Sequence, residues 1–277
     1  MGQIHYTVDA SVEYDYDPSI GWVLDTTINV DRADGTLQGG FQTTITTACL
    51  TDPGCDPTQS IGDTPENASF FMSAGATFNG HYHQVATTMV NNEARILDGT
   101  LGNLVTFSSA SKTVVNNDAS YNDLAGRCDI RLGSSVRAGC INQMGWAFIV
   151  YDEKRYPAVK EVAAHVFDSI RNLPSHWGSP DGAQLNRTTE QTWIDRNRRV
   201  MCGTFPSGID TCDEYPLASS RQGGTGAAPD NRSIRGVPKA ANDSQGGQNT
   251  TYYNFYRILD GDPFYVQVYL ADGRSAW

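Results

Sequence analysis

The hydrophobic pattern of the chain changes near Tyr156, and this change is the strongest constraint on the fold. Before that point, short runs rich in Val, Thr, Phe and Tyr are separated by Gly, Asp, Asn and Pro, which is typical of strands joined by turns. After it, apolar residues recur at spacings of three and four from Val159 to Ile170, which predicts an amphipathic helix beginning near Pro157. The chain is therefore expected to be of the α+β class.

Two regions follow from this pattern. Residues 1–151 are predicted to form an acidic, antiparallel β-rich domain that is sandwich-like and of unknown role. Residues 152–277 are predicted to form an α+β domain, and the helix after Pro157 could belong to either region. Two further helices are expected, one over TTEQTWIDRNRRV and one that begins near Asn242.

The cysteines fall into three pairs that are close in sequence. No CxxC pattern and no nearby His cluster accompany them, so a structural zinc site is not indicated. Short loops favour pairing within each pair, although six free buried thiols in a cytosolic protein are the alternative. Disulfides indicate an oxidising compartment and a secreted or periplasmic protein. The expected pairings are Cys49–Cys55, Cys128–Cys140 and Cys202–Cys212.

The charge is distributed unevenly along the chain. Residues 186–277 hold 10 basic and 10 acidic residues, so the net charge of −11 arises in residues 1–185. An acidic surface repels phosphates, which leaves the neutral, Arg-rich C-terminal third as the candidate for binding nucleic acid. No stretch approaches the roughly 20 apolar residues that span a membrane. No signal peptide is visible after Met1. We expect that a leader sequence has been removed.

A group of carboxylates and carboxamides in this third could carry chemistry. Asp213 and Glu214 are adjacent, directly after a cysteine. Some 28 residues later, Asn242, Gln245 and Asn249 are spaced so that they share one face of a helix. Oxygen ligands of these kinds suit Mg²⁺ or Mn²⁺. A solvated turn is the alternative for the acidic pair.

The segments CDEYPLASSRQGG, SIRGVPKAANDSQGG and FYRILDGDPFYV together resemble the NucA/NucB family of secreted bacterial deoxyribonucleases. The resemblance covers roughly residues 186–270, about a third of the chain. It implies a fold like that of the ββα-metal endonucleases, with an Asp in place of the usual general-base His. One departure is the pair Arg221–Gln222, which stands where family members often carry acids, so an acidic role at that point is in doubt.

The resemblance also implies roles for single residues. Asp213 would be the general base and Asn242 the metal ligand. Glu214 would help to place metal or water, and Gln245 or Asn249 would hold the water shell of the metal. The remaining candidates are Arg235 at the catalytic centre, and Arg221, Arg257 and Gln248 in substrate binding.

The function expected from these residues is a secreted, Mg²⁺- or Mn²⁺-dependent, largely non-specific endonuclease acting on DNA, with RNA as a further candidate substrate. It would scavenge extracellular DNA or act as a toxin, with an unidentified immunity or surface-binding partner. The rival is a non-enzymatic glycan- or protein-binding β-sandwich with a degenerate nuclease-like domain.

Two other groups are open to a functional reading. His81 and His83 share a strand face and could hold a metal, although no third ligand is identifiable. The aromatic residues from Tyr252 to Tyr256 could stack nucleobases, although packing in the core is the more ordinary role.

Overall fold

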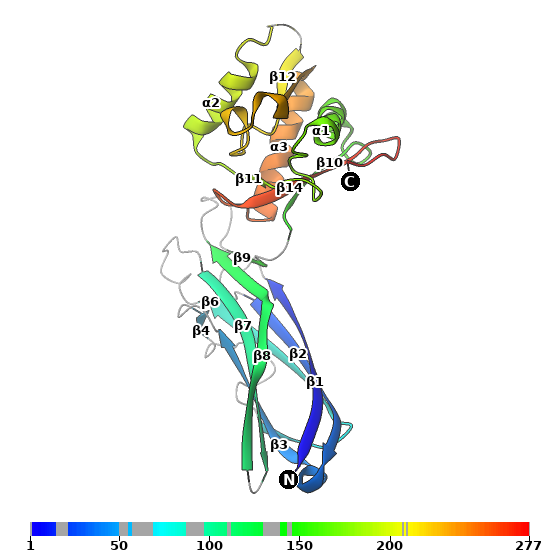
Figure 1. The fold of residues 1–277 in the computed structure, drawn as a ribbon, viewed down its shortest axis with the longest axis vertical. Coiled ribbons are helices and arrows are strands. Elements are labelled where there is room, and N and C mark those ends of the chain that lie inside the picture. Colours follow the sequence, from blue (N-terminus) through cyan, green and yellow to red (C-terminus); the bar gives the residue numbers. More distant parts are fainter. Residues whose placement is uncertain are drawn as a thin grey trace. The chain divides into compact units, whose positions relative to one another are not determined.

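The chain divides into two compact units, Met1–Gly145 and Trp146–Trp277 (Figure 1). The computed structural model describes residues 2–14, 22–49, 55–56, 69–86, 97–109, 112–129, 139–142, 146–206, 208 and 210–276. The division precedes the boundary expected at residue 151. Its cause is strand β10 (Phe148–Asp152), which pairs in parallel with β14 (Pro263–Tyr269) of the second unit.

The described part of the first unit consists of two antiparallel sheets, with strand orders β1-β2-β6-β4 and β5-β3-β7-β8-β9. The strands are β1 (Gln3–Tyr14), β2 (Trp22–Asp34), β3 (Phe41–Cys49), β4 (Cys55–Asp56), β5 (Ser69–Met72), β6 (Thr77–Ala86), β7 (Leu97–Ser109), β8 (Lys112–Asp129) and β9 (Gly139–Asn142). A short 3-10 turn (Gly35–Leu37) separates β2 from β3.

The two sheets share one apolar core. Alternate residues of β2 are buried from Leu24 to Val30, as the two-residue period of a strand requires. They pack with Phe41 and Ile45 of one neighbouring strand and Phe107 of another, both in the second sheet. Two sheets covering a common core give the sandwich-like arrangement expected from the sequence.

The described cysteines are oxidised. The expected disulfide between Cys202 and Cys212 is present. Cys140 is also disulfide-bonded, and it lies opposite Cys128 in the register of β8 and β9. The expected pairing of Cys49 with Cys55 lies outside the described side chains.

The second unit combines a mixed sheet, a hairpin and helices. The sheet has the order β10-β14-β11, and β12 and β13 form an antiparallel hairpin. The elements that follow β10 are α1 (Lys160–Asn172), β11 (Leu185–Asn186), α2 (Gln191–Cys202), β12 (Asp210–Tyr215), β13 (Ser233–Pro238), α3 (Lys239–Phe255) and β14. Short 3-10 turns lie at Pro157–Val159, Gly224–Gly226 and Pro229–Asn231.

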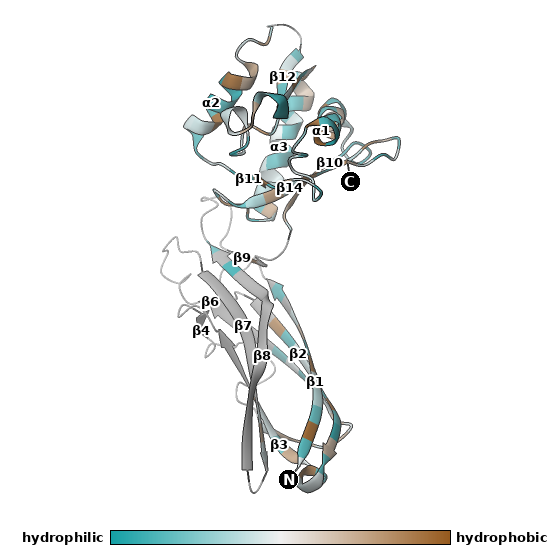
Figure 2. Ribbon diagram, in the orientation of Figure 1, coloured by the Kyte–Doolittle hydropathy of each residue, from teal (hydrophilic) through white to brown (hydrophobic). Residues whose placement is uncertain are grey.

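The helix predicted after Pro157 is confirmed as a 3-10 turn that leads into α1. Its buried residues include Val162, Val166 and Ile170, in one core with Val266 of β14. Figure 2 shows apolar and polar residues alternating along this helix. Each fully buried aliphatic side chain contributes about 1.5–3 kcal/mol, so this stripe holds α1 against the sheet.

Among the described residues, no helix combines the length and apolar character needed to cross a membrane.

Candidate active site

The two adjacent acids of β12 lie on opposite faces of the hairpin, because side chains alternate along a strand. Asp213 is 1% exposed and points to α1, where its Oδ2 accepts a hydrogen bond from His165 Nδ1 at 2.7 Å. Glu214 points the other way, toward a cavity between α2 and α3. Asp213 is absent from the lining of that cavity. The structure therefore separates the two residues that the sequence had placed in one site.

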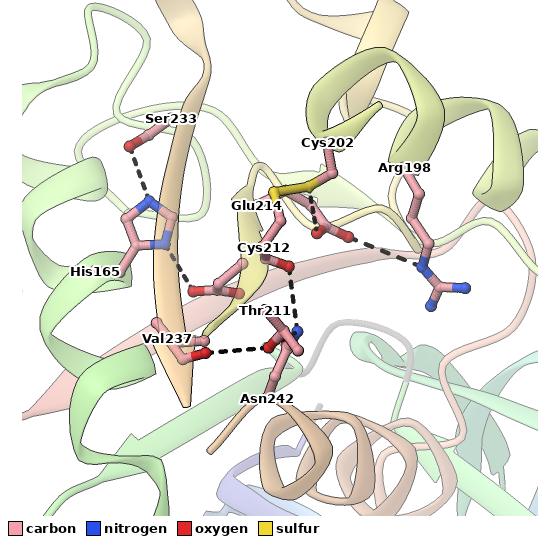
Figure 3. Close-up of a disulfide and its surroundings, with 10 residues drawn as sticks. His165, Arg198, Cys202, Thr211, Cys212, Glu214, Ser233, Val237 and Asn242 are labelled. Carbon is pink, nitrogen blue, oxygen red and sulfur yellow. Dashed lines mark hydrogen bonds and ion pairs between the residues drawn. A yellow bond between two sulfur atoms is a disulfide. The ribbon is translucent and has the colours of Figure 1, made fainter. Parts of the chain in front are cut away.

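His165 links α1 to both strands of the hairpin (Figure 3). Its Nε2 lies 2.8 Å from Ser233 Oγ on β13, while its Nδ1 holds Asp213 on β12. The imidazole is fully buried. This Asp-His-Ser arrangement therefore anchors the hairpin on α1.

Arg235 also faces α1. It lies directly across the hairpin from Asp213, and its Nη2 donates to Asp168 Oδ2 at 2.7 Å. It does not line the cavity, so its expected place at the catalytic centre is not supported by the geometry.

The cavity beside Glu214 has a volume of about 490 Å³. It is bounded by the Cys202–Cys212 disulfide, which joins the end of α2 to β12. Its polar lining includes Arg198, Glu214, Asn242, Asp243, Gln245 and Asn249. A cavity with converging polar groups is the usual form of a small-molecule or catalytic site.

The environment of Glu214 raises its pKa to about 7. Burial is the main cause, since its side chain is 15% exposed, and the negative charge of Asp213 adds to it. Arg198, whose Nε lies 4.0 Å from Glu214 Oε1, acts in the opposite direction. The carboxylate also lies 3.5 Å from Cys202 Sγ. A carboxylate with a pKa near neutrality is well matched to accepting a proton from water.

Helix α3 presents a row of carboxamides to the cavity. Asn242, Gln245 and Asn249 all line it, which confirms that they share one face, although the helix begins at Lys239 rather than near Asn242. Both hydrogen bonds of the Asn242 side chain use Nδ2, which donates to Thr211 Oγ1 and to the Cys212 carbonyl, each at 3.2 Å. The Oδ1 atom of Asn242 therefore remains available for a ligand.

The other two carboxamides differ in how they are held. Gln245 is 6% exposed, and its Nε2 makes no hydrogen bond of good geometry among the described residues, although its side chain lies close enough to the Tyr151 hydroxyl to interact with it. Asn249 Oδ1 accepts a hydrogen bond of 2.6 Å from the Tyr151 hydroxyl. A buried amide donor without a partner is costly, so Gln245 is suited to binding a group that enters the cavity.

The donors at this site fit a hard divalent cation better than a thiolate-bound metal. Within the described part of the chain, the sole group of metal-binding side chains close enough together is Cys202, Cys212 and Glu214, and its two sulfurs are joined in a disulfide. The remaining donors are amide oxygens and the Asp243 carboxylate, which pairs with Lys239 at 2.5 Å. Oxygen donors with room for water suit Mg²⁺.

The three residues expected to bind substrate lie elsewhere. Arg257 is 1% exposed and is the largest fully buried side chain among the described residues, so it cannot present its guanidinium to DNA. Arg221 forms an ion pair of 2.7 Å with Asp260. Gln248 lies outside the cavity lining, and its buried Oε1 has no hydrogen-bond partner among the residues that the structure describes.

The Gly-rich loop after β12 packs on α2. Gln222 exchanges two hydrogen bonds with Asn186 of β11, so this departure from the family pattern anchors the loop. A side chain at Gly224, where φ is +52°, would lie 2.5 Å from the Asn197 Cα. Gly224 is therefore required for the close packing of this loop against α2.

Arg198 is the cavity residue that sequence reasoning missed. It lies on α2 among exposed arginines in the segment DRNRRV. The expected disulfide between Cys202 and Cys212 could have indicated Arg198 as a site residue, because that bond brings the end of α2 beside Glu214.

Two glycines in the middle of α3 provide a test of the cavity. A Cβ at either Gly246 or Gly247 would meet no atom within 4 Å, but Gly246 lines the cavity and Gly247 does not. Both Gly→Ala changes should stabilise the protein by about 0.5–1 kcal/mol. Only Gly246→Ala should weaken substrate binding, as measured by the KM for DNA cleavage. Equal KM values for the two variants would contradict the assignment of this cavity as the substrate site.

The site therefore consists of a two-stranded hairpin followed directly by a helix, with an acid of near-neutral pKa facing an amide-lined helix face. Comparison with protein families indicates the class of protein that carries this site. Residues 177–267 match the family deoxyribonuclease NucA/NucB, and this part of the chain belongs to that family of nucleases. A search of curated proteins finds no match to the chain. The first unit lies entirely outside the matched residues.

Proposed function

We propose that the second unit is a metal-dependent endonuclease that hydrolyses phosphodiester bonds of DNA, with Glu214 as the general base. The observation that carries the proposal is the near-neutral pKa of Glu214 in a cavity opposite the carboxamide face of α3. Membership in a deoxyribonuclease family supports DNA as the substrate. RNA, which shares the phosphodiester, is a further candidate.

The residues of the cavity divide the work of hydrolysis. Glu214 takes the proton of the attacking water, and the buried Gln245 amide donates to a non-bridging phosphate oxygen or to a water. Arg198, with a half-exposed side chain, binds the phosphate. The order β12, β13, α3 agrees with a ββα-metal arrangement. In this assignment Asp213 lies on the opposite face of β12, and its negative charge helps to keep the pKa of Glu214 raised.

A divalent cation, Mg²⁺ or Mn²⁺, would be held by the Asn242 Oδ1 atom and by waters bound to Asn249 and Asp243. Bound there, it would stabilise the negative charge that develops on the phosphate. Glu214 is reserved for proton transfer in this proposal.

Exposed arginines give the nuclease unit a surface for the DNA backbone. Arg196 and Arg199 are exposed on α2, the helix that carries the cavity residue Arg198. Contacts between arginine and phosphate do not depend on sequence, which supports a largely non-specific nuclease.

The setting of the enzyme is also part of the proposal. The disulfide at the cavity and the family of secreted nucleases support an extracellular protein. There it would degrade DNA for nutrition or act as a toxin, with an immunity or surface-binding partner of the first unit still to be identified.

Cleavage of supercoiled plasmid tests metal dependence. Wild type should nick and linearise the DNA with Mg²⁺ or Mn²⁺ and lose this activity in EDTA. Asn242→Ala should raise the metal concentration for half-maximal cleavage by about 10- to 100-fold. Asn254→Ala, on the same helix but outside the cavity, is the matched control. Cleavage that persists in EDTA would contradict the proposed metal dependence. No cleavage with any cation would favour the alternative of a non-enzymatic binding protein with a degenerate nuclease-like domain.

A further inference from the structure

A group of aromatic residues lies at the C-terminal end of α3. The rings of Tyr252 and Tyr256 are nearly parallel, with an interplanar angle of 15° and centroids 6.4 Å apart. Phe255, 55% exposed, meets the Tyr256 ring edge-on at 4.9 Å. Tyr156, 38% exposed, lies near Tyr252 and raises its pKa, although burial is the larger cause. Tyr252 and Tyr256 are partly buried and pack against the core with one side, whereas Tyr253 is buried within it.

This group continues the face of α3 that lines the cavity. Tyr252 and Tyr256 follow Asn249 at spacings of three and seven, the same spacings that join Asn242 to Gln245 and Asn249. At 1.5 Å per residue, the two rings begin about 4.5 Å and 10.5 Å beyond Asn249 along the helix axis. A strand whose phosphate is bound in the cavity would therefore carry a neighbouring nucleotide over these rings.

The charges beside the rings suit the backbone of such a strand. The Arg155 Cζ lies 5.3 Å from the centre of the Tyr156 ring, and Lys154 and Lys160 are exposed nearby in sequence. Asp152 also faces Tyr252, but its carboxylate accepts hydrogen bonds from the backbone amides of Lys154 and Arg155. Aromatic rings edged by cations are the usual surface for single-stranded nucleic acid.

We propose that Tyr156, Tyr252 and Tyr256 form a stacking subsite for an unpaired nucleobase of the DNA strand bound at the Glu214 cavity. The proposal rests on the proposed nuclease function. A base inside a duplex has both of its faces covered by its neighbours. The subsite therefore selects single-stranded or locally unpaired DNA.

Binding to a catalytically blocked protein tests the subsite without cleavage. The full chain carrying Glu214→Gln is titrated, in Mg²⁺, against a fluorescein-labelled dT12 strand, the same strand with abasic sites, and a 12-base-pair duplex. Adding Tyr252→Leu and Tyr256→Leu should weaken dT12 binding by about tenfold or more and duplex binding by less than twofold. Tyr265→Leu, which alters an aromatic residue on the outer side of β14, should leave both unchanged.

The abasic strand separates stacking from a general loss of structure. Removing the bases should weaken binding to the parent protein by much more than it weakens binding to the double variant, which keeps only the Tyr156 ring of the subsite. If the double variant fails to fold, the same binding measurements are made with Tyr156→Leu, which changes an exposed residue. Equal affinities of the parent for dT12 and the abasic strand would overturn the subsite. Failure of the nuclease assignment would appear separately, as plasmid that wild type leaves uncut in Mg²⁺.

Discussion

Replacing Glu214 by Gln is expected to slow DNA cleavage by about 10²- to 10⁴-fold, the usual effect of removing a general base. Gln keeps the size of the side chain and its place beside Arg198, but it cannot accept a proton from water. Because the pKa of Glu214 is about 7, cleavage by wild type should rise with pH through neutrality and then level off. The residual activity of the variant should lack this rise. The measurement is single-turnover cleavage of a labelled DNA between pH 5.5 and 8.5.

Asp213→Asn is the contrast that separates the two acids. Its side chain faces His165 in the core, so the change should lower stability by about 1–3 kcal/mol. It also removes a charge that raises the pKa of Glu214, so the pH profile should shift toward lower pH. Cleavage should persist where the protein is folded. Asp210→Asn, at the exposed start of β12, should alter neither property.

The opposite result would restore the assignment that the family resemblance implied. If folded Asp213→Asn loses as much activity as Glu214→Gln, then Asp213 takes part directly in the reaction. In that case the hairpin must change its exposure of Asp213 when DNA binds.

The elements of the second unit could be predicted because their patterns are local. The apolar spacing from Val159 to Ile170 specifies a helix whatever it packs against, and the spacing of the carboxamides specifies their common face. The alternation of side chains along a strand is also a local rule, and it could have been applied to β12. Neighbours on a strand point to opposite faces, so Asp213 and Glu214 could not both serve one cavity.

Other features depend on partners that are distant in sequence. His165 lies 48 residues from Asp213, and no pattern around either residue indicates their hydrogen bond. Arg257 carries the charge expected of a phosphate-binding residue, but the fold buries it completely. Strand β10 continues the β-rich pattern of the first unit, yet it pairs with β14 more than 100 residues later. Tertiary packing decided each of these cases.

The stability of the protein should fall as the pH rises past the pKa of Glu214. The folded-state pKa of about 7 exceeds the ordinary value of 4.5, so the folded protein binds more protons than the unfolded chain between these values. Stability contributed by the protonated acid is therefore fully present below about pH 4.5 and is lost as the pH rises through 7. Glu214→Gln carries no charge to bury, so it should match wild type at pH 4.5 and exceed it above pH 7.5 by up to about 3 kcal/mol.

Urea unfolding at pH 4.5, 6 and 8 measures this difference, read by amide hydrogen exchange of peptides from β12 and α3. The readout must be local because the chain has two units, which need not unfold together. EDTA in all samples removes any contribution from bound cations. Glu190→Gln, at the exposed residue before α2, should show no such dependence. A difference between wild type and Glu214→Gln that stays constant from pH 4.5 to 8 would contradict the buried acid of raised pKa on which the catalytic assignment depends.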